Sequence, residues 1–290
     1  MLKKLLFAVF ALNLLLPVSS AMAQDTKRSI TDLGNNIYRF QDNMHYSVFI
    51  VGKQGLLMTD PISTEAATWL RKEVRQRFGD LPIKYVIYSH NHLDHVAGGE
   101  VFRDPGTTFI AHEKAAEDLR RNHAQTVIPD TTFSDHMQID FEGRKIALQY
   151  YGPNNGAGNI SMYVPDARFL FVVDWIILKR LPFKEMYYYD FEGSIASLKQ
   201  VLQLDFDKVA PGHSVVGNKD DVRENLAYLE ELRDAVLKAM NEGKTLEQMQ
   251  REITLPRYAA FANYEEWLPL NIKGAYEQLS RLSGRYGQEK

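Results

Sequence analysis

The sequence has no cysteine among its 290 residues. Disulfide bonds therefore cannot stabilise the fold, which must depend on its apolar core. A metal site in this chain also cannot use thiolate ligands. Any such site must be built from histidine and carboxylate side chains, which zinc accepts as readily as thiolate.

Long hydrophobic runs are almost as scarce, and one occurs at the N-terminus. Lys3 and Lys4 precede an apolar run from Leu5 to Leu14 or slightly beyond, and the small-residue triplet Ala21-Met22-Ala23 follows Pro17. The run is shorter than the ~20 residues that span a bilayer, so an uncleaved anchor is the less favoured alternative. The pattern is typical of a signal peptide, residues 1–23, cut after Ala23. It predicts a periplasmic or secreted protein without an integral membrane segment after cleavage.

An excess of charge of one sign is also lacking. The chain has 34 basic and 37 acidic residues, a net charge of −3. Cleavage of the signal peptide would remove two lysines and no acid, which leaves 32 basic residues and a net charge of −5. This balance provides no basic surface for nucleic acid or anionic lipid, so we expect a small-molecule substrate rather than a nucleic-acid partner.

The mature chain, residues 24–290, is predicted to form a single domain, because no linker or repeat divides it. Alternating or apolar runs predict strands at 36–41, 46–52, 55–60, 83–89, 145–151, 160–165, 168–174 and 208–212, and another that ends at Ala111. Helical spacing predicts a helix over 64–78 with Thr64 as its cap, a second after Ala111, and a third near 193–204. A long amphipathic helix over 220–240, ended by Gly243, and two or three shorter helices to about residue 282 should follow. The long helix can pack on its own domain or on a partner, so the oligomeric state stays open.

Four metal-binding side chains lie within six positions in "YSHNHLDHVAGG" (88–99): His90, His92, Asp94 and His95. Residues two apart on a strand point the same way, so His90 and His92 can approach one ion while the other two address a second. A single histidine is usually a surface or core residue, but four donors so close together make that explanation improbable. Zinc suits these ligand types.

Two more potential ligands end apolar strands elsewhere in the chain. "FLFVVD" ends in Asp174, and "VAPGHS" places His213 in a tight turn. The alternative is that Asp174 caps a helix, but "DWIILKRLPF" is a poor helix start. A carboxylate at position 174 can bridge two cations with its two oxygens.

These motifs make the chain resemble the metallo-β-lactamase superfamily. "HNHLDH" (90–95) fits the family motif H-x-H-x-D-H, "VVDW" fits the segment with the bridging aspartate, and "APGHS" fits the last histidine motif. The resemblance covers the mature chain and implies an α/β fold, an αββα sandwich of the metallo-β-lactamase type, with a C-terminal helical extension from about residue 219. It implies a first metal site with His90 and His92, a second with Asp94, His95 and His213, and a shared Asp174. It also implies that Asp94 orients the attacking water.

One segment departs from the family pattern. The family reads G-P-x-H-T-x-G-N where this chain reads "GPNNGAGN" (152–159), so Asn155 replaces the third histidine of the first site and Gly156 replaces the threonine. An amide oxygen is a weak, neutral zinc ligand. We therefore expect one or two zinc ions, with the Asp94/His95/Asp174/His213 site the tighter. The remaining histidines are His45, His112, His123 and His136, and none of them lies in a segment that the family uses for the missing ligand. His112 is expected to end a strand near the pocket.

The predicted function is an exported zinc-dependent hydrolase. Zinc lowers the pKa of a bound water from ~15.7 to about 7, and the default target is an acyl-type bond: lactam, lactone, ester or thioester. Phosphodiester and sulfate-ester cleavage also occur among relatives, and the fold cannot choose between them. Asn155 favours an alternative, a catalytically weakened or inactive metal- or ligand-binding protein of the cell envelope, but the six intact ligands oppose it. Redox use of iron is less favoured, because iron-using relatives carry additional acidic ligands.

The residues of the substrate pocket are harder to assign. Tyr46, Trp175, Phe183 and the run Tyr187-Tyr188-Tyr189 lie in or near loops that lead to the cleft in this family. Packing beneath the tail helices would explain these aromatic residues equally well. Lys179 and Arg180 are either partners for an anionic substrate group or solvated surface charges.

Overall fold

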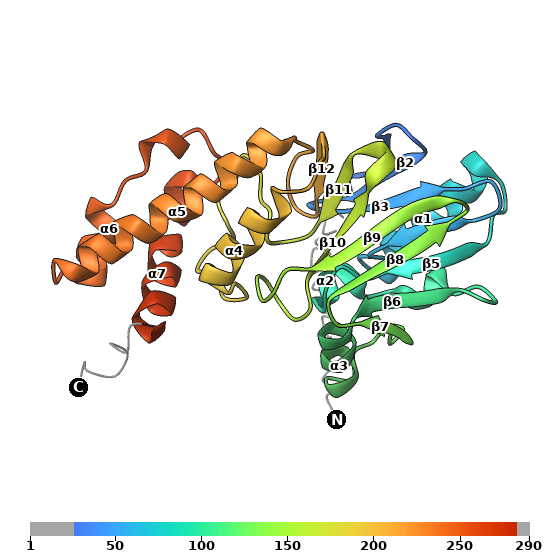
Figure 1. Cartoon of the computed structure of the whole chain (residues 1–290), viewed down its shortest axis with the longest axis horizontal. Coiled ribbons are helices and arrows are strands. Elements are labelled where there is room, and N and C mark those ends of the chain that lie inside the picture. The colour runs from blue at the N-terminus through green and yellow to red at the C-terminus, as the bar shows by residue number, and fades with distance from the viewer. Residues whose placement is uncertain (1–25, 283–290) are drawn as a thin grey trace, which may run out of the picture.

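A computed structural model describes residues 26–282 and consists of two β-sheets packed face to face with helices on both outer faces (Figure 1). The α/β class and the αββα sandwich with C-terminal helices are thereby confirmed. The predicted signal peptide, residues 1–23, lies outside the described residues.

The first sheet has seven strands in sequential order. They are β1 (Arg28–Asp32), β2 (Ile37–Asp42), β3 (His45–Val51), β4 (Leu56–Thr59), β5 (Ile83–Ile87), β6 (Thr108–His112) and β7 (Thr131–Phe133). Short turns join β1 to β4, so these strands pair antiparallel. From β4 to β7 the pairing is parallel, because helical crossovers connect these strands. The crossovers contain α1 (Thr64–Phe78), α2 (Leu93–Val96) with a 3₁₀ turn (Gly99–Phe102), and α3 (Glu113–Arg121).

The second sheet has the order β12-β11-β10-β9-β8. Its strands are β8 (His136–Phe141), β9 (Arg144–Tyr150), β10 (Ile160–Val164), β11 (Phe169–Val172) and β12 (Lys208–Pro211). Strands β8 to β11 pair antiparallel, whereas β12 pairs parallel to β11 after the crossover helix α4 (Phe191–Val201). The sequence analysis missed β1, β7, β8 and the short α2, which carry weak apolar patterns or few residues.

Three apolar layers hold the sandwich together. Between the sheets, residues such as Leu57 of β4 and Phe171 of β11 interdigitate. Leu70 of α1 and Leu119 of α3 pack on the outer face of the first sheet. Helix α4 lies on the outer face of the second sheet, and the C-terminal helices pack beyond it (Figure 1). Helix α5 (Lys219–Asn241) contacts α4, α7 (Tyr264–Leu282) contacts α5, and α6 (Leu246–Glu252) contacts α7; a 3₁₀ turn spans Pro256–Tyr258.

Helix boundaries follow local capping chemistry. Helix α1 spans residues 64–78 as predicted, but its cap is Ser63 rather than Thr64, since the Ser63 hydroxyl accepts the Ala66 N–H. Helix α5 begins with a capping box of Asn218 and Asp221 and ends just before Gly243.

The C-terminal helices are fastened to the loop that follows β11. Tyr228 of α5 donates a hydrogen bond to Asn271 of α7, and the Asn271 amide donates to the carbonyls of Pro182 and Lys184. Helix α7 therefore fixes the conformation of this loop. Figure 1 shows these helices on one side of the sandwich, next to α4.

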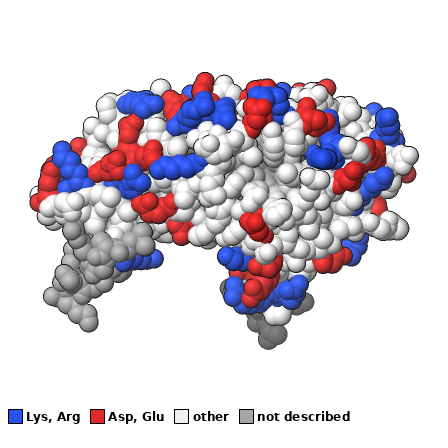
Figure 2. Space-filling model, in the orientation of Figure 1, with Lys and Arg blue, Asp and Glu red and all other residues white. Residues whose placement is uncertain are grey.

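The surface charge and the composition of the helices indicate which kinds of partner the protein can bind. On the face in Figure 2, basic and acidic side chains are interspersed and neither sign forms a continuous patch. Among the helices between residues 26 and 282, none combines the length and the apolar character required to cross a membrane.

Candidate metal centre and cavity

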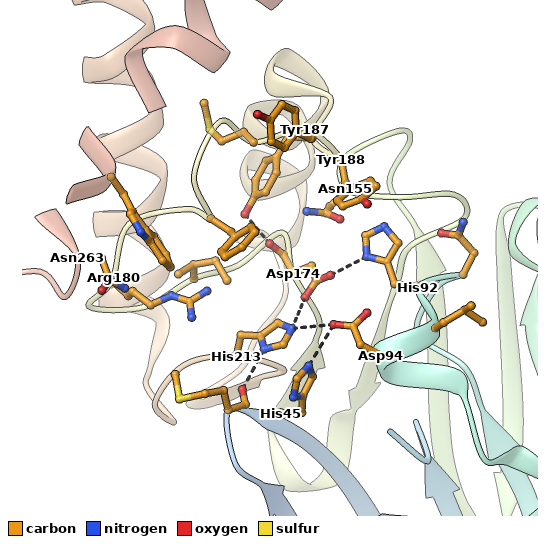
Figure 3. Close-up of a pocket in the computed structure, with 18 residues that line it drawn as sticks. His45, His92, Asp94, Asn155, Asp174, Arg180, Tyr187, Tyr188, His213 and Asn263 are labelled. Carbon is orange, nitrogen blue, oxygen red and sulfur yellow. Dashed lines mark hydrogen bonds and ion pairs between the residues drawn. The ribbon is translucent and has the colours of Figure 1, made fainter. Parts of the chain in front are cut away.

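The predicted metal ligands converge where several strands end at the same edge of the sandwich. His90 and His92 follow β5, and Asp174 and His213 follow β11 and β12. These side chains are far apart in sequence, but Figure 3 shows His92, Asp94, Asp174 and His213 pointing into one cavity.

Asp174 lies at the centre of this cluster. Its Oδ2 is 3.1 Å from His90 Nε2 and 3.0 Å from His92 Nδ1. Its Oδ1 is 3.4 Å from His95 Nε2 and 3.1 Å from His213 Nε2. One carboxylate therefore separates two pairs of imidazoles, which is the arrangement that a bridging ligand requires. The backbone of Asp174 is left-handed, with φ of 70°, so the cluster holds this residue in a rare conformation.

The polar atoms of the cluster fit a bound cation. His90 Nε2, Asp174 Oδ1 and Asn155 Oδ1 are buried, and none of them makes a hydrogen bond of good geometry within residues 26–282, although the first two lie 3.1 Å from an oppositely charged or polar atom. Each unsatisfied buried group costs roughly 1–3 kcal/mol, which a metal ion would offset. Burial also lowers the pKa of His90 to about 4, so its imidazole is neutral, as a ligand must be.

The charges around His95 also favour a cation. Burial by itself would lower the pKa of His95, but the carboxylates of Asp174, Asp60 and Asp94 outweigh it and raise this pKa to about 9. A site that holds an imidazole in its charged form has excess negative charge. A divalent cation would neutralise the same carboxylates.

Asp60, which the sequence analysis missed, supports two of the imidazoles. It follows β4, is fully buried, and accepts hydrogen bonds from the Ser89 N–H (2.8 Å) and hydroxyl (2.6 Å). Ser89 Oγ lies 2.8 Å from His90 Nδ1, and Asp60 Oδ2 lies 3.9 Å from His95 Nδ1. Burial raises the pKa of Asp60 to about 6. Outer carboxylates of this kind orient metal-binding histidines. The signal was an apolar strand, "LLMT", that ends in aspartate, as the strand before Asp174 does.

His45 is the second residue that the sequence analysis missed. It begins β3, and its Nε2 lies 3.1 Å from Asp94 Oδ2. Its ring meets those of His95 and His213 edge-on, with centroids 5.5 Å and 4.7 Å away. No sequence motif indicated this histidine. It reaches the site through the turn between β2 and β3, and none of the other residues of the cluster lies near it in the sequence.

Asn155, the residue expected from the sequence to replace a histidine ligand, also lies at the cavity. It is among the residues that line the cavity, its Oδ1 is buried, and its backbone carbonyl accepts a hydrogen bond from Asn159. The next residue, Gly156, has φ of 67°, and a Cβ there would lie 2.9 Å from His92 Nε2 and 3.1 Å from His90. Glycine at position 156 therefore allows this loop to lie directly against the two histidines.

A cavity of about 850 Å³ opens beside the metal-binding cluster. Its walls are mostly apolar and include Met44, Leu93, Ile177, Phe183, Met186, Tyr187, Tyr188, Tyr189 and Trp267. Phe183 and Tyr187–Tyr189 thus line it, as the sequence analysis considered. Arg180 lies in the wall with its guanidinium 5.3 Å from the Trp267 ring, on the side opposite His92 (Figure 3). No acidic side chain between residues 26 and 282 forms a salt bridge with it, whereas Lys179 is exposed and paired with Asp221 and Glu224.

Two predicted pocket residues lie elsewhere and require correction. Trp175 is 1% exposed and packs against Tyr151 in the core, because the chain turns inward directly after Asp174. Tyr46 lies beneath the guanidinium of Arg39, 3.6 Å away, rather than in the cavity wall. His112 ends β6 as expected, but it caps α3 and contacts the Ser134 carbonyl instead of the cavity.

Comparisons with known proteins agree with this geometry. The model of the metallo-beta-lactamase superfamily matches residues 41–213. The alpha subunit of 2,4-dinitroanisole O-demethylase from Nocardioides sp. (strain JS1661) is 28% identical over 180 residues, which are 61% of this chain and 55% of that subunit. The chain therefore spans about half the length of that relative.

Two solved structures share the fold. A metallo-beta-lactamase from Pontibacter korlensis has a TM-score of 0.62 at 18% identity and covers 70% of this chain and 99% of its own. A stereoselective inverting sec-alkylsulfatase from Pseudomonas sp. has a TM-score of 0.71 at 17% identity. That match covers 90% of this chain and 51% of the sulfatase.

Proposed function

Because the chain belongs to the metallo-beta-lactamase superfamily, we propose that it is a zinc-dependent hydrolase of a small, largely apolar substrate. The observation that carries the proposal is the position of Asp174 between two pairs of imidazoles, at the floor of an apolar cavity. Histidine and aspartate are suitable zinc ligands, and a cavity of about 850 Å³ is large enough for a molecule of ordinary ligand size.

The proposed roles follow from the side chains themselves. His90, His92, Asp94, His95, Asp174 and His213 would hold the metal. Asp60 supports His90 through the Ser89 hydroxyl and places a carboxylate 3.9 Å from His95 Nδ1. A bound zinc ion supplies Lewis acidity, which makes water a nucleophile near neutral pH. Asp94 Oδ2 reaches the cavity, and its neighbour His45 holds the pKa of this carboxyl well below its usual range despite partial burial. Asp94 can therefore accept a hydrogen bond from an attacking water and orient it.

Arg180 is proposed to select for a substrate with an electron-rich or anionic group. Its Nε is buried without a partner within residues 26–282, and burial lowers the pKa of the guanidinium without removing its charge. An unpaired cation in an apolar wall gains the most from a complementary ligand group, since a charge-assisted hydrogen bond is worth ~1.5–3 kcal/mol. The aromatic side chains beside it suit an aromatic or alkyl body.

Replacing Arg180 by methionine should therefore raise KM for an anionic aromatic substrate roughly 10- to 150-fold, because ~1.5–3 kcal/mol of binding is lost. Hydrolysis of a neutral analogue should change little. Lys179→Met is the matched control: Lys179 is the adjacent cation, but it points to solvent and pairs with Asp221 and Glu224. Equal effects of the two substitutions, or equal effects of Arg180→Met on both substrates, would contradict this role.

The bond that is cleaved is proposed to be of acyl type: lactam, lactone, ester or thioester. Metal polarisation of a carbonyl is the default chemistry of such a site. A second candidate is an activated aryl ether, whose hydrolysis yields an alcohol and a phenol. The similarity to a subunit of 2,4-dinitroanisole O-demethylase favours this candidate.

A substrate panel tests the proposal. The purified zinc-loaded protein would be assayed with nitrocefin, an aryl lactone, an aryl ester, an aryl thioester, an aryl phosphodiester and 2,4-dinitroanisole. We expect turnover of at least one carbonyl substrate or of the ether, abolished by a chelator. Absence of turnover across the panel by a protein that retains zinc would favour the weakened or inactive binding protein instead.

We also propose that the protein is exported, on the strength of the N-terminal segment "MLKKLLFAVFALNLLLPVSSAMA". Expression of the full chain in a Gram-negative bacterium should yield a periplasmic product whose intact mass corresponds to a start at Gln24. A full-length product confined to the cytoplasm would contradict export.

A further inference from the structure

We propose that His45 is a metal ligand of the second site. The first site has Asn155 where a third imidazole is expected, and the second site gains a third imidazole from His45. The inference rests on the metal centre of the proposed function. It assigns His45, His95 and His213 to one ion, together with Asp94 and one oxygen of Asp174. The first site would keep His90 and His92, with the other oxygen of Asp174 and the amide of Asn155.

The potential ligand atoms of the second site lie close together. His45 Nε2 is 3.1 Å from Asp94 Oδ2, and His95 Nε2 is 2.8 Å from His213 Nε2. Asp94 Oδ2 lies 3.9 Å from His95 Nε2 and 4.0 Å from His213 Nε2. All four side chains offer one atom within 4.8 Å of the others. Ligand atoms bound to one zinc ion at ~2.0–2.1 Å are themselves roughly 3–4 Å apart, depending on the number of ligands.

The backbone around His45 holds its side chain in this position. His45 pairs with Asp42 at the closed end of the β2–β3 hairpin. The Tyr46 N–H donates to the Gly212 carbonyl, and His213 Nδ1 lies 2.9 Å from the Met44 carbonyl. The hairpin and the loop with His213 are therefore one hydrogen-bonded unit. A ligand on a strand end is positioned more rigidly than one on a free loop.

Arg39 also connects the β2–β3 hairpin to the loop of His213. Its guanidinium is buried, lies over the Tyr46 ring and donates to the carbonyls of Pro211 and Ser214, on both sides of His213. The hydrogen bond from His213 Nδ1 to a carbonyl directs its Nε2 into the cluster, as is usual for metal-binding histidines. His45 and His213 thus reach the cavity from one rigid support.

The comparison between the two sites predicts which one retains metal. At the first site, His90 Nε2 and His92 Nδ1 face Asp174 Oδ2 and the neutral Asn155 amide. At the second site, three imidazoles face two carboxylates. Because imidazole is a much stronger zinc ligand than an amide, the second site should hold the tighter ion. In the family pattern, by contrast, the first site has three imidazoles and the second site has two.

The test measures metal retention rather than turnover. Wild type, His45→Ala, Asn155→His and the double variant would be loaded with zinc, dialysed against chelators of graded strength and analysed for zinc content. Cobalt-substituted samples would report the coordination by their visible absorption. His136→Ala is the matched control, since His136 is exposed at the start of β8. Thermal unfolding of the metal-free proteins checks that each variant folds.

Wild type and the control should retain one ion under conditions that strip His45→Ala. The affinity lost in His45→Ala should exceed the ~10–100-fold that loss of an outer-shell partner costs, and the cobalt spectrum should change. The double variant should regain one ion, now at the first site. Unchanged retention in His45→Ala, or a smaller loss with an unchanged cobalt spectrum, would overturn the inference and leave His45 as a hydrogen-bond partner of Asp94. A wild type that binds no divalent metal would instead refute the proposed function itself.

Discussion

Asp174→Asn should release metal from both sites and lower kcat/KM at least about 10³-fold, or ~4 kcal/mol in the activation barrier. The reason is geometric and electrostatic: each oxygen of Asp174 faces a separate pair of imidazoles, at 3.0 to 3.4 Å. Asparagine keeps the shape of the side chain but removes its charge and replaces one acceptor oxygen by a donor NH₂ group. Such a group repels a cation.

Asparagine is chosen over alanine because it tolerates the left-handed backbone at position 174. Zinc content and steady-state kinetics check the prediction. Asp135→Asn is the control, because the Asp135 side chain is 73% exposed. Within residues 26–282 it forms one salt bridge, with His136. If Asp174→Asn retained zinc and activity, Asp174 could not be the shared ligand and the proposed metal centre would be wrong.

Removal of metal should lower the melting temperature by roughly 8–16 °C. At a free zinc concentration 1,000 times Kd, binding to the native state stabilises it by ~4.1 kcal/mol. For chains of this size each kcal/mol shifts the melting temperature by ~2–4 °C. The physical source is the cluster itself, in which the carboxylates of Asp60, Asp94 and Asp174 and several unpaired polar atoms are brought together in or near the core.

Calorimetry or fluorescence in the presence and absence of a chelator measures this shift. Zinc added back in excess should restore the higher melting temperature, whereas magnesium should not, because magnesium prefers oxygen ligands. In Asp174→Asn, the chelator should have little effect. A chelator-independent melting temperature in wild type would mean that the cluster is stable without a cation, contrary to the metal-binding role.

Much of the local structure could be predicted from the sequence. Apolar periodicity predicted the strand near residues 83–87 and the helices α1 and α5, and Gly243 predicted where α5 ends. These signals act within a few residues of the chain. The motif "HNHLDH" also indicated a metal site, because donors at such short spacing after a strand need little tertiary information to converge. The same local reasoning placed Asp174 and His213 at strand ends.

The remaining site residues depend on contacts between distant segments. His45 reaches the cluster because the β2–β3 hairpin binds the loop of His213 through backbone hydrogen bonds, which no side-chain pattern encodes. Asp60 gains its role from burial beside Ser89. For Tyr46 and Trp175, the resemblance to the family suggested a place in the cavity, but the packing of neighbouring layers directed both side chains away from it.

The sequence by itself determined the family, the strand ends and the set of metal-binding residue types, because these follow from short-range periodicity and from motif chemistry. The tertiary structure alone decided that His45 lies beside Asp94, His95 and His213. It also decided that Arg180 faces a cavity while Lys179 faces solvent, and that helix α7 brings Trp267 to the cavity wall. The physical reason is that such contacts depend on how sheets and helices pack. A residue's own neighbours in sequence specify which way its side chain points, but not which distant segment it meets.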